Sequence, residues 1–260
     1  MDSTDFALII DAGGFAKGYG TAAALQTEYL LKGMSLLNYD VVNLATKDFT
    51  GGGELLKNIG KKFDTPFVSS NIVYSENDKN FVEPYLLKKV SVTNSKSRPP
   101  FEKLTIGVLG LCDEREALLH RSDDEAQLKS YDPLLAAHTF LPKLSKADLI
   151  VLVYNGRYSQ LQQVLEHVDD VDIVIMGGEY YRANHYRGTD IVMASTPSLG
   201  KYFSLLTLQL DKNKNIISSK KRQIPLDESI PDNEELDKLV REFSQAKQNA
   251  PRVSNASSSR

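Results

Sequence analysis

Polar side chains follow several short apolar runs of this chain. Asp11 follows the run at residues 6–10, and Thr46, Lys47 and Asp48 follow the next such run. In α/β proteins the loops after the carboxyl ends of strands usually carry ligands and catalytic groups. We therefore expect these loops to converge. The residues that follow later apolar runs, and join the same candidate group, are Tyr154, Asn155, Glu179, Tyr180 and Tyr181.

Carboxylate, amide, lysine and phenol groups gathered in this way can form a hydrogen-bonded polar pocket. In a second interpretation Lys47 pairs with Glu179 or Asp48 and satisfies buried charge without binding anything. Glu179 alone is a poor metal site. The candidates for ligand binding are Asp11, Lys47, Asp48, Asn155, Glu179 and Tyr180.

Cys112 is the only cysteine, so intrachain disulfides and thiolate zinc clusters are excluded. It follows an apolar run and is either a small buried hydrophobe or a redox-active thiol. Asp113 and Glu114 would oppose thiolate formation. The four histidines do not form a metal-binding pair at i, i+4 spacing. The glycines at 51–53 lack the lysine and serine or threonine of a phosphate-binding loop, and we interpret them as a turn.

The elements that must position these residues alternate between strand and helix. Compact apolar runs predict buried strands, and helical spacing or a capping residue predicts helices. Thr21 is the expected cap of the first helix, and Asp132 with Pro133 starts a later one. The expected strands are 6–10, 41–44, 67–70, 104–111, 149–153 and 173–176, and the expected helices after Thr21 are 54–62, the one from Asp132, and 159–168.

The remaining segments do not continue the regular alternation of strand and helix. Residues 81–92 are expected to be extended, 94–100 a polar loop, and 112–131 a long loop or lid. In the last third, strands are expected at 191–194, 203–210 and 216–223, the last two forming a hairpin. One mixed α/β domain is predicted at 1–230, followed by an amphipathic connecting helix at 231–248 and a disordered tail at 249–260. The apolar positions of that helix are Leu236, Leu239, Val240 and Phe243.

The composition of the chain argues against two classes of binding partner. The 260 residues carry a net charge of -3, with 41% hydrophobic and 25% charged residues. This is the composition of an ordinary soluble protein, and without a basic surplus we expect neither nucleic acid nor an acidic membrane face as partner. The first residues contain no signal-peptide pattern, and no apolar run is long enough for membrane insertion.

The order of segments resembles the metallophosphatase domain of the bacterial 5′-nucleotidase family, within the calcineurin-like metallophosphoesterases. The likeness extends over most of residues 6–242. It rests on nine pieces in the family's order, among them IIDAGG at 9–14, NYDVVNLATKDF at 38–49, LTIGVLGL at 104–111, IVLVYNG at 150–156 and DIVIMGGEYY at 172–181. The resemblance implies a β-sandwich of two mixed sheets flanked by helices.

The family uses two divalent metals to polarise a phosphate ester and generate hydroxide. In this chain Gly14 stands in place of the bridging aspartate, and Thr46 and Lys47 stand in place of an asparagine ligand and a histidine. Tyr154 aligns with a histidine ligand. In the last motif Glu179 and Tyr181 replace ligands as well. The resemblance implies that the family's Asp-x-His motif would lie on a strand upstream of Met1. The positive charge of Lys47 also disfavours metal.

The resemblance and these exchanges together predict a catalytically degenerate 5′-nucleotidase-like domain without a metal cofactor. It would bind a partner protein or a small anionic ligand at the strand ends. The alternative is a phosphoric ester hydrolase with a rearranged manganese, cobalt or zinc site that uses Asp48 and Glu179. A second alternative is a redox role for Cys112. The resemblance also suggests a periplasmic or other extracytoplasmic location with the signal removed.

Overall fold

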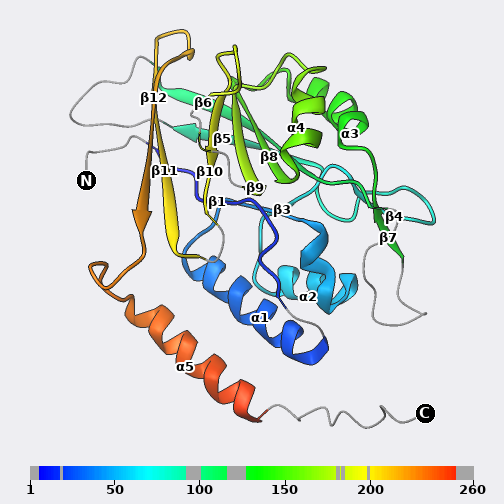
Figure 1. The fold of residues 1–260 in the computed structure, drawn as a ribbon, viewed down its shortest axis with the longest axis vertical. Helices are drawn as coiled ribbons and strands as arrows, with labels where there is room; N and C mark the ends of the chain where they lie inside the picture. The colour runs from blue at the N-terminus through cyan, green and yellow to red at the C-terminus, as the bar shows by residue number, and fades with distance from the viewer. Residues whose placement is uncertain are drawn as a thin grey trace.

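The centre of the protein is a five-stranded sheet with the strand order β10-β9-β8-β6-β5 (Figure 1). The computed structural model describes residues 6–17, 20–91, 101–115, 127–179, 182, 185–197 and 200–249. Four of the strands are parallel and β5 is antiparallel to β6, so the sheet is mixed. The strands are β5 (Tyr85–Ser91), β6 (Lys103–Cys112), β8 (Leu149–Gly156), β9 (Ile173–Gly178) and β10 (Val192–Ser195).

A second layer covers one face of this sheet and consists of two separate pieces. The first is a parallel sheet of β1 (Ile10–Asp11), β2 (Val41–Asn43) and β3 (Phe67–Val68). The second is the antiparallel hairpin of β11 (Tyr202–Leu210) and β12 (Ile216–Pro225). A further small antiparallel sheet joins β4 (Ile72–Tyr74) to β7 (Leu128–Ser130).

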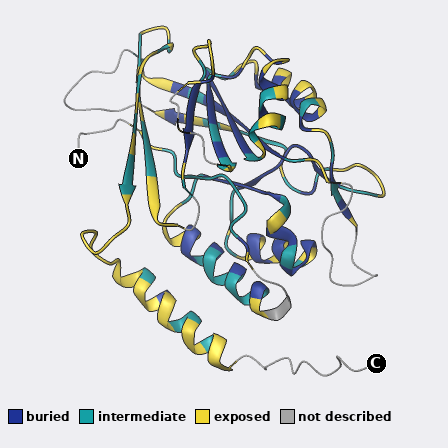
Figure 2. Cartoon of the chain, viewed as in Figure 1, coloured by how far each residue is buried: buried dark blue, intermediate teal, exposed yellow. Residues whose placement is uncertain are grey.

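Helices complete the layers. The helices α3 (Pro133–Phe140) and α4 (Tyr158–Leu165), with the 3-10 helix η2 (Leu141–Leu144), pack on the outer face of the five-stranded sheet. The helices α1 (Gly20–Leu36) and α2 (Gly53–Lys62), with the 3-10 helix η1 (Thr46–Gly51), pack beside the first piece of the second layer. The last helix, α5 (Glu234–Asn249), contacts α1 and is mostly exposed (Figure 2).

The burial of the central strands explains why their sequences lack alternation. In β6 and β8, runs of six or more consecutive residues are buried, because layers cover both faces of the sheet.

The start of α3 also follows from its sequence. Asp132 accepts a hydrogen bond from the N–H of Leu134 at 2.8 Å, and Pro133, which has no N–H to satisfy, begins the helix.

Most of the expected elements are confirmed, and several boundaries are corrected. Residues 128–130 of the expected lid form β7, because they pair with β4, and 116–126 lie outside the described residues, as do 94–100 and 250–260. The first helix begins at Gly20, so Thr21 lies inside it and does not cap it. The helix expected at 159–168 ends at Leu165. Within the described residues, no helix is long and apolar enough to cross a membrane.

Candidate functional site

Asp48 links the two loops that follow β1 and β2. The chain turns into η1 directly after Ala45, which returns the Asp48 carboxylate toward the strand ends. The carboxylate accepts hydrogen bonds from the backbone N–H groups of Gly14 at 2.8 Å, Ala16 at 3.0 Å and Ala45 at 2.9 Å. Asp48 is buried, and its burial raises the pKa of its carboxyl group to about 7 against the lowering effect of these donors.

Two asparagines hold the same loop against the sheets. Asn155, at the end of β8, donates its side-chain N–H to the carbonyl of Gly13 at 2.7 Å. Asn43 donates to the carbonyls of Ala12 at 3.2 Å and Leu111 at 3.0 Å. Gly13 has a φ of 86°, and a Cβ there would lie 2.7 Å from the Asn43 carbonyl oxygen, so only glycine fits. Asn155 therefore positions a loop.

Asp11 lies at the start of this loop, and its side chain bonds to the backbone of the loop. Its carboxylate accepts the N–H of Gly13 at 2.7 Å, and burial raises the pKa of the Asp11 carboxyl group above its ordinary value. The hydrogen bond to Gly13 stabilises the turn after β1.

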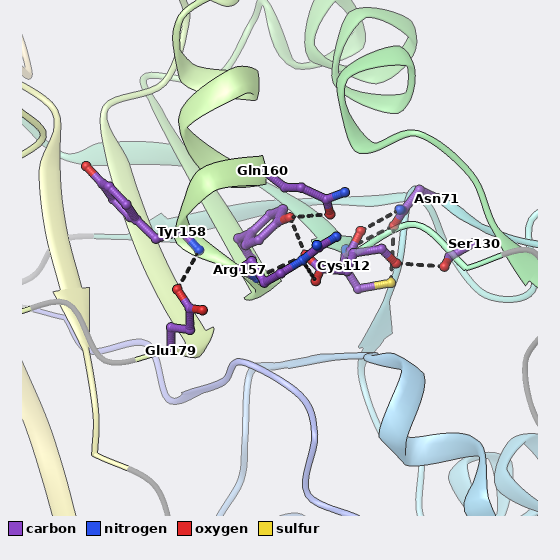
Figure 3. A network of polar contacts seen from close by, with 9 residues as sticks. Asn71, Cys112, Ser130, Arg157, Tyr158, Gln160 and Glu179 are labelled. Carbon is purple, nitrogen blue, oxygen red and sulfur yellow. Dashed lines mark hydrogen bonds and ion pairs between the residues drawn. The ribbon is translucent and has the colours of Figure 1, made fainter.

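Tyr154 takes part in a polar network around Asp113, of which Figure 3 labels Arg157 and Gln160. Its buried hydroxyl donates to Asp113 Oδ1 at 2.7 Å, and burial raises the pKa of the phenol far above its ordinary value, with a further contribution from Asp113. Arg157 donates its Nε to Asp113 Oδ2 and its backbone N–H to Oδ1, both at 3.0 Å. In the orientation that satisfies both ends of its amide, Gln160 donates to Asp113 Oδ1 at 2.8 Å and accepts from Arg157 at 3.0 Å.

Glu179 stabilises the start of a helix. Its Oε2 accepts the backbone N–H of Tyr158, the first residue of α4, at 2.8 Å (Figure 3). A carboxylate at this end also interacts favourably with the helix dipole. Glu179 is exposed, and the two tyrosines that follow it, Tyr180 and Tyr181, lie outside the described residues.

The expected pairing of Lys47 with Glu179 or Asp48 is wrong. Asp48 is enclosed by three backbone N–H groups, Glu179 binds the start of α4, and no ion pair within the described part of the chain includes Lys47. Lys47 is exposed and Thr46 is half-buried. Because η1 turns the lysine outward, it does not fill the strand-end space.

Cys112 is held in a closed environment. Its backbone N–H donates to Asn71 Oδ1 at 3.0 Å, and its thiol lies 3.6 Å from the same oxygen. The side chain is fully buried, and burial raises the pKa of the thiol to about 12. A thiol with this pKa stays protonated at neutral pH, so the structure opposes the redox interpretation.

Sequence reasoning missed four members of these networks: Asn71, Asp113, Arg157 and Gln160. Asn71 donates to the carbonyls of Cys112 at 2.7 Å and Tyr131 at 2.8 Å, so it joins β6 to the segment after β7. In the sequence, Asn71 and Asp113 could have been recognised as polar residues that directly follow an expected strand. Arg157 and Gln160 could not be recognised in this way, because their contacts depend on the position of α4.

The donor set does not fit a dinuclear metal centre. Gly14 offers no side chain, Tyr154 is a neutral phenol bonded to Asp113, and Asp48 accepts three backbone hydrogen bonds. Among the described residues no group of three or more His, Cys, Asp or Glu side chains could hold a metal ion. His138, His167 and His185 are exposed, and His120 lies outside the described residues.

Comparison with known proteins identifies the fold. No family model matches the chain. A 5′-nucleotidase precursor from Thermus thermophilus superimposes with a TM-score of 0.72 at 17% identity, over 93% of this chain and 50% of that one. A calcineurin-like phosphoesterase of Bacillus subtilis gives a TM-score of 0.71 at 17% identity, over 92% of this chain and 83% of that one. This chain has the metallophosphatase fold.

A curated relative agrees with this assignment. The 2′,3′-cyclic-nucleotide 2′-phosphodiesterase/3′-nucleotidase of Salmonella typhimurium is 26% identical over 159 residues. The match includes 56% of this metallophosphatase-fold chain and 24% of the relative, so the chain spans about a quarter of that protein's length. The proteins that this chain resembles are named as nucleotidases and phosphoesterases, and the metallophosphatase fold expected from the resemblance, with several sheets flanked by helices, is confirmed.

Proposed function

We propose that this chain is a metallophosphatase-fold domain that does not hydrolyse phosphate esters and acts by binding at its strand ends. The observation that carries the proposal is that the polar groups at the expected ligand positions bond to the protein itself. Asp48 closes the loop after β1, Tyr154 bonds to Asp113, and Glu179 caps α4. These hydrogen bonds hold the strand-end loops in place, so the loops need no metal ion to join them.

The charges at this edge favour an anionic ligand or an acidic partner surface. The carboxylates of Asp48, Asp113 and Glu179 already accept hydrogen bonds from the protein. Lys47 is exposed, and Arg157 is 60% exposed while Asp113 fixes its orientation. A guanidinium held in this way keeps further N–H groups for a carboxylate or phosphate. The resemblance also leads us to propose an extracytoplasmic location.

The competing function is a phosphoric ester hydrolase with a rearranged metal site, which the activities named for the relatives favour. Elemental analysis of the purified protein, together with turnover of a chromogenic phosphate ester and nucleoside monophosphates with manganese, cobalt or zinc, separates the two functions. We expect no bound metal and no metal-dependent turnover. Turnover that is lost in Glu179→Ala and kept in the exposed control Glu166→Ala would overturn the proposal.

Binding is measured separately with adenosine monophosphate as the probe. We expect saturable changes of the amide NMR signals of residues 45–48 and 155–158, and about tenfold weaker binding in Arg157→Gln. The control is Arg241→Gln, on the exposed side of α5. If the probe leaves these signals unchanged, the anionic small-molecule branch is wrong and the partner-protein branch remains.

A further inference from the structure

A pocket of about 320 Å³ lies at the end of the β1–β2–β3 sheet opposite the strand-end loops. It is formed by the ends of α1 and α2 and by the segments that lead into β2 and β3. Its volume lies within the range of clefts that hold small ligands. The apolar and charged residues that line this pocket are Met34, Tyr39, Asp40, Phe63, Asp64 and Pro66.

Both helices end at the pocket in the same way. After α1, Asn38 has a φ of 52°, and the N–H of Tyr39 donates to the carbonyl five residues earlier at 3.1 Å. After α2, Asp64 has a φ of 48°, and the N–H of Thr65 donates to the carbonyl five residues earlier at 2.9 Å. A left-handed residue followed by this hydrogen bond is a Schellman motif. Two fixed helix ends therefore frame the pocket.

The electrostatic surroundings of the pocket favour a cation. The carboxyl-terminal ends of two helices meet there, and each carries a partial negative charge. Asp40 and Asp64 add carboxylates, and none of the described residues that line the pocket is basic. Asp40 pairs with Lys88 and accepts the N–H of Ile9 at 2.9 Å. Asp64 is exposed, and no ion pair within the described part of the chain includes it.

Asp64 also occupies a position that is unfavourable for an acidic residue. Its charge lies at the negative end of the α2 dipole, and glycine is the residue that fits the left-handed conformation best. The two lysines in the last turn of α2 are Lys61 and Lys62, and neither lines the pocket. Lys62 pairs with Glu28 at 2.6 Å. A cation bound beside Asp64 would therefore relieve an unfavourable charge.

The walls of the pocket suit an organic cation better than a metal ion. Tyr39 and Phe63 are half-buried aromatic residues, and the faces of aromatic rings attract cations. The ammonium group of Lys62 already lies 5.2 Å from the centroid of the Phe63 ring. Two carboxylates are too few for a hard metal ion, whereas alkyl groups on a cation would cover the apolar walls.

We propose that this pocket binds a small alkylammonium ion. The charged nitrogen would lie beside Asp64 and the alkyl groups against Tyr39 and Phe63, where cation–π attraction adds to the attraction between the charges. The pocket lies at the opposite end of the sheet from the strand-end loops. The inference thus goes beyond the proposed function and does not depend on the absence of hydrolysis.

The probe is choline, titrated into the intact chain and followed by the amide NMR signals of residues 38–40 and 63–65. We expect saturable binding with a Kd on the order of 1 mM. The control ligand is the neutral alcohol in which carbon replaces the choline nitrogen, and it should bind at least about tenfold more weakly because it has the shape without the charge. Equal binding of the two ligands, or no saturation by choline, would overturn the proposal.

Asp64→Asn tests the charge and keeps the helix end, because asparagine is well suited to the left-handed conformation. We expect about tenfold weaker binding of choline. The control is Asp78→Asn, at an aspartate that also has a positive φ, 54°, but does not line the pocket. This control should leave choline binding unchanged. Native affinity in Asp64→Asn would contradict the proposal.

A peptide that contains trimethyllysine, titrated in the same way, distinguishes the two sources of an alkylammonium group. Tighter binding than choline assigns the pocket to a side chain of a partner protein, and weaker binding assigns it to a free amine. Both results support an ammonium site. The metal and turnover assays report on the strand ends, so their outcome and the outcome of these titrations are independent.

Discussion

At the scale of single residues, Asp48 is the group that determines the conformation of the strand-end loops. One carboxylate accepts three backbone N–H groups from two loops, and two of these donors share one oxygen. An amide in its place must direct an NH2 group toward N–H donors. We expect Asp48→Asn to lower the free energy of unfolding by about 1–3 kcal/mol, measured by urea titration. Asp232→Asn, an exposed change, should lower it by less than about 0.5 kcal/mol.

The same residue predicts a pH dependence. The pKa of the Asp48 carboxyl group is raised from 3.8 to about 7, so the folded state holds this proton more tightly than the unfolded state. Its contribution to stability is therefore fully present below about pH 4 and is lost as pH rises through about pH 7. The stability difference between the native chain and Asp48→Asn should shrink over that range. A difference that grows with pH would show that the backbone donors outweigh burial.

Tyr154 gives a second prediction at this scale. Tyr154→Phe removes the hydroxyl that donates to Asp113 but leaves the ring in the core. Because Asp113 keeps Arg157 as a donor, we expect a loss of about 1 kcal/mol in the free energy of unfolding. Tyr202→Phe, at an exposed ring, is the matched control. An unchanged stability of Tyr154→Phe would mean that this hydrogen bond contributes nothing to folding.

The sequence located the loops but not the partners of their side chains. Asp11, Asp48, Asn155 and Glu179 were singled out because they follow strands, and all four lie in strand-end loops or strand ends. The predicted ion pair of Lys47 was wrong because opposite charges in a sequence do not show which way the side chains point. The backbone N–H groups that donate to Asp48 also cannot be recognised in the sequence. Backbone donors become available only when the loops after β1 and β2 have folded.

At the scale of elements, α5 shows what an amphipathic pattern can predict. The helix was expected from four apolar positions, of which Leu239 is buried and Phe243 packs on Tyr29 with ring centroids 5.4 Å apart. Val240 is 60% exposed, so its expected place in the interface is wrong. The reason is geometric: the main packing contact of α5 among the described residues is with α1, and one neighbouring helix covers only a narrow stripe of another.

This narrow interface predicts local release of α5. Leu239→Ala removes the buried anchor of the helix next to Gly33, and we expect amide protection in residues 234–249 to fall by a factor that corresponds to about 2 kcal/mol or more. The amides of β8 should keep their protection, measured by hydrogen exchange. Val240→Ala is the control one residue away and should leave α5 protected. Loss of protection in β8 as well would show that α5 unfolds together with the core.

At the scale of the whole molecule, the alternation of strand and helix predicted one mixed α/β domain, and the resemblance to the 5′-nucleotidase family implied the sandwich. Sequence reasoning did not predict that the second layer is divided into the sheet of β1, β2 and β3 and the hairpin of β11 and β12. The apolar pattern of β11 is the same whether a neighbouring strand is present or not, so the division becomes visible only in the strand pairing of the folded chain.

The final prediction concerns metal and the stability of the whole fold. A metal bound only to the folded state would raise the unfolding free energy by about 2.7 kcal/mol at a hundred times its Kd. Because the strand-end loops are joined by hydrogen bonds from Asp48, Asn155 and Tyr154, we expect neither a chelator nor added zinc or manganese to shift the thermal unfolding midpoint. The measurement is calorimetry of the intact chain at fixed pH. A midpoint that rises with zinc in the native chain but not in Glu179→Ala would place a metal at the strand ends and support the hydrolase.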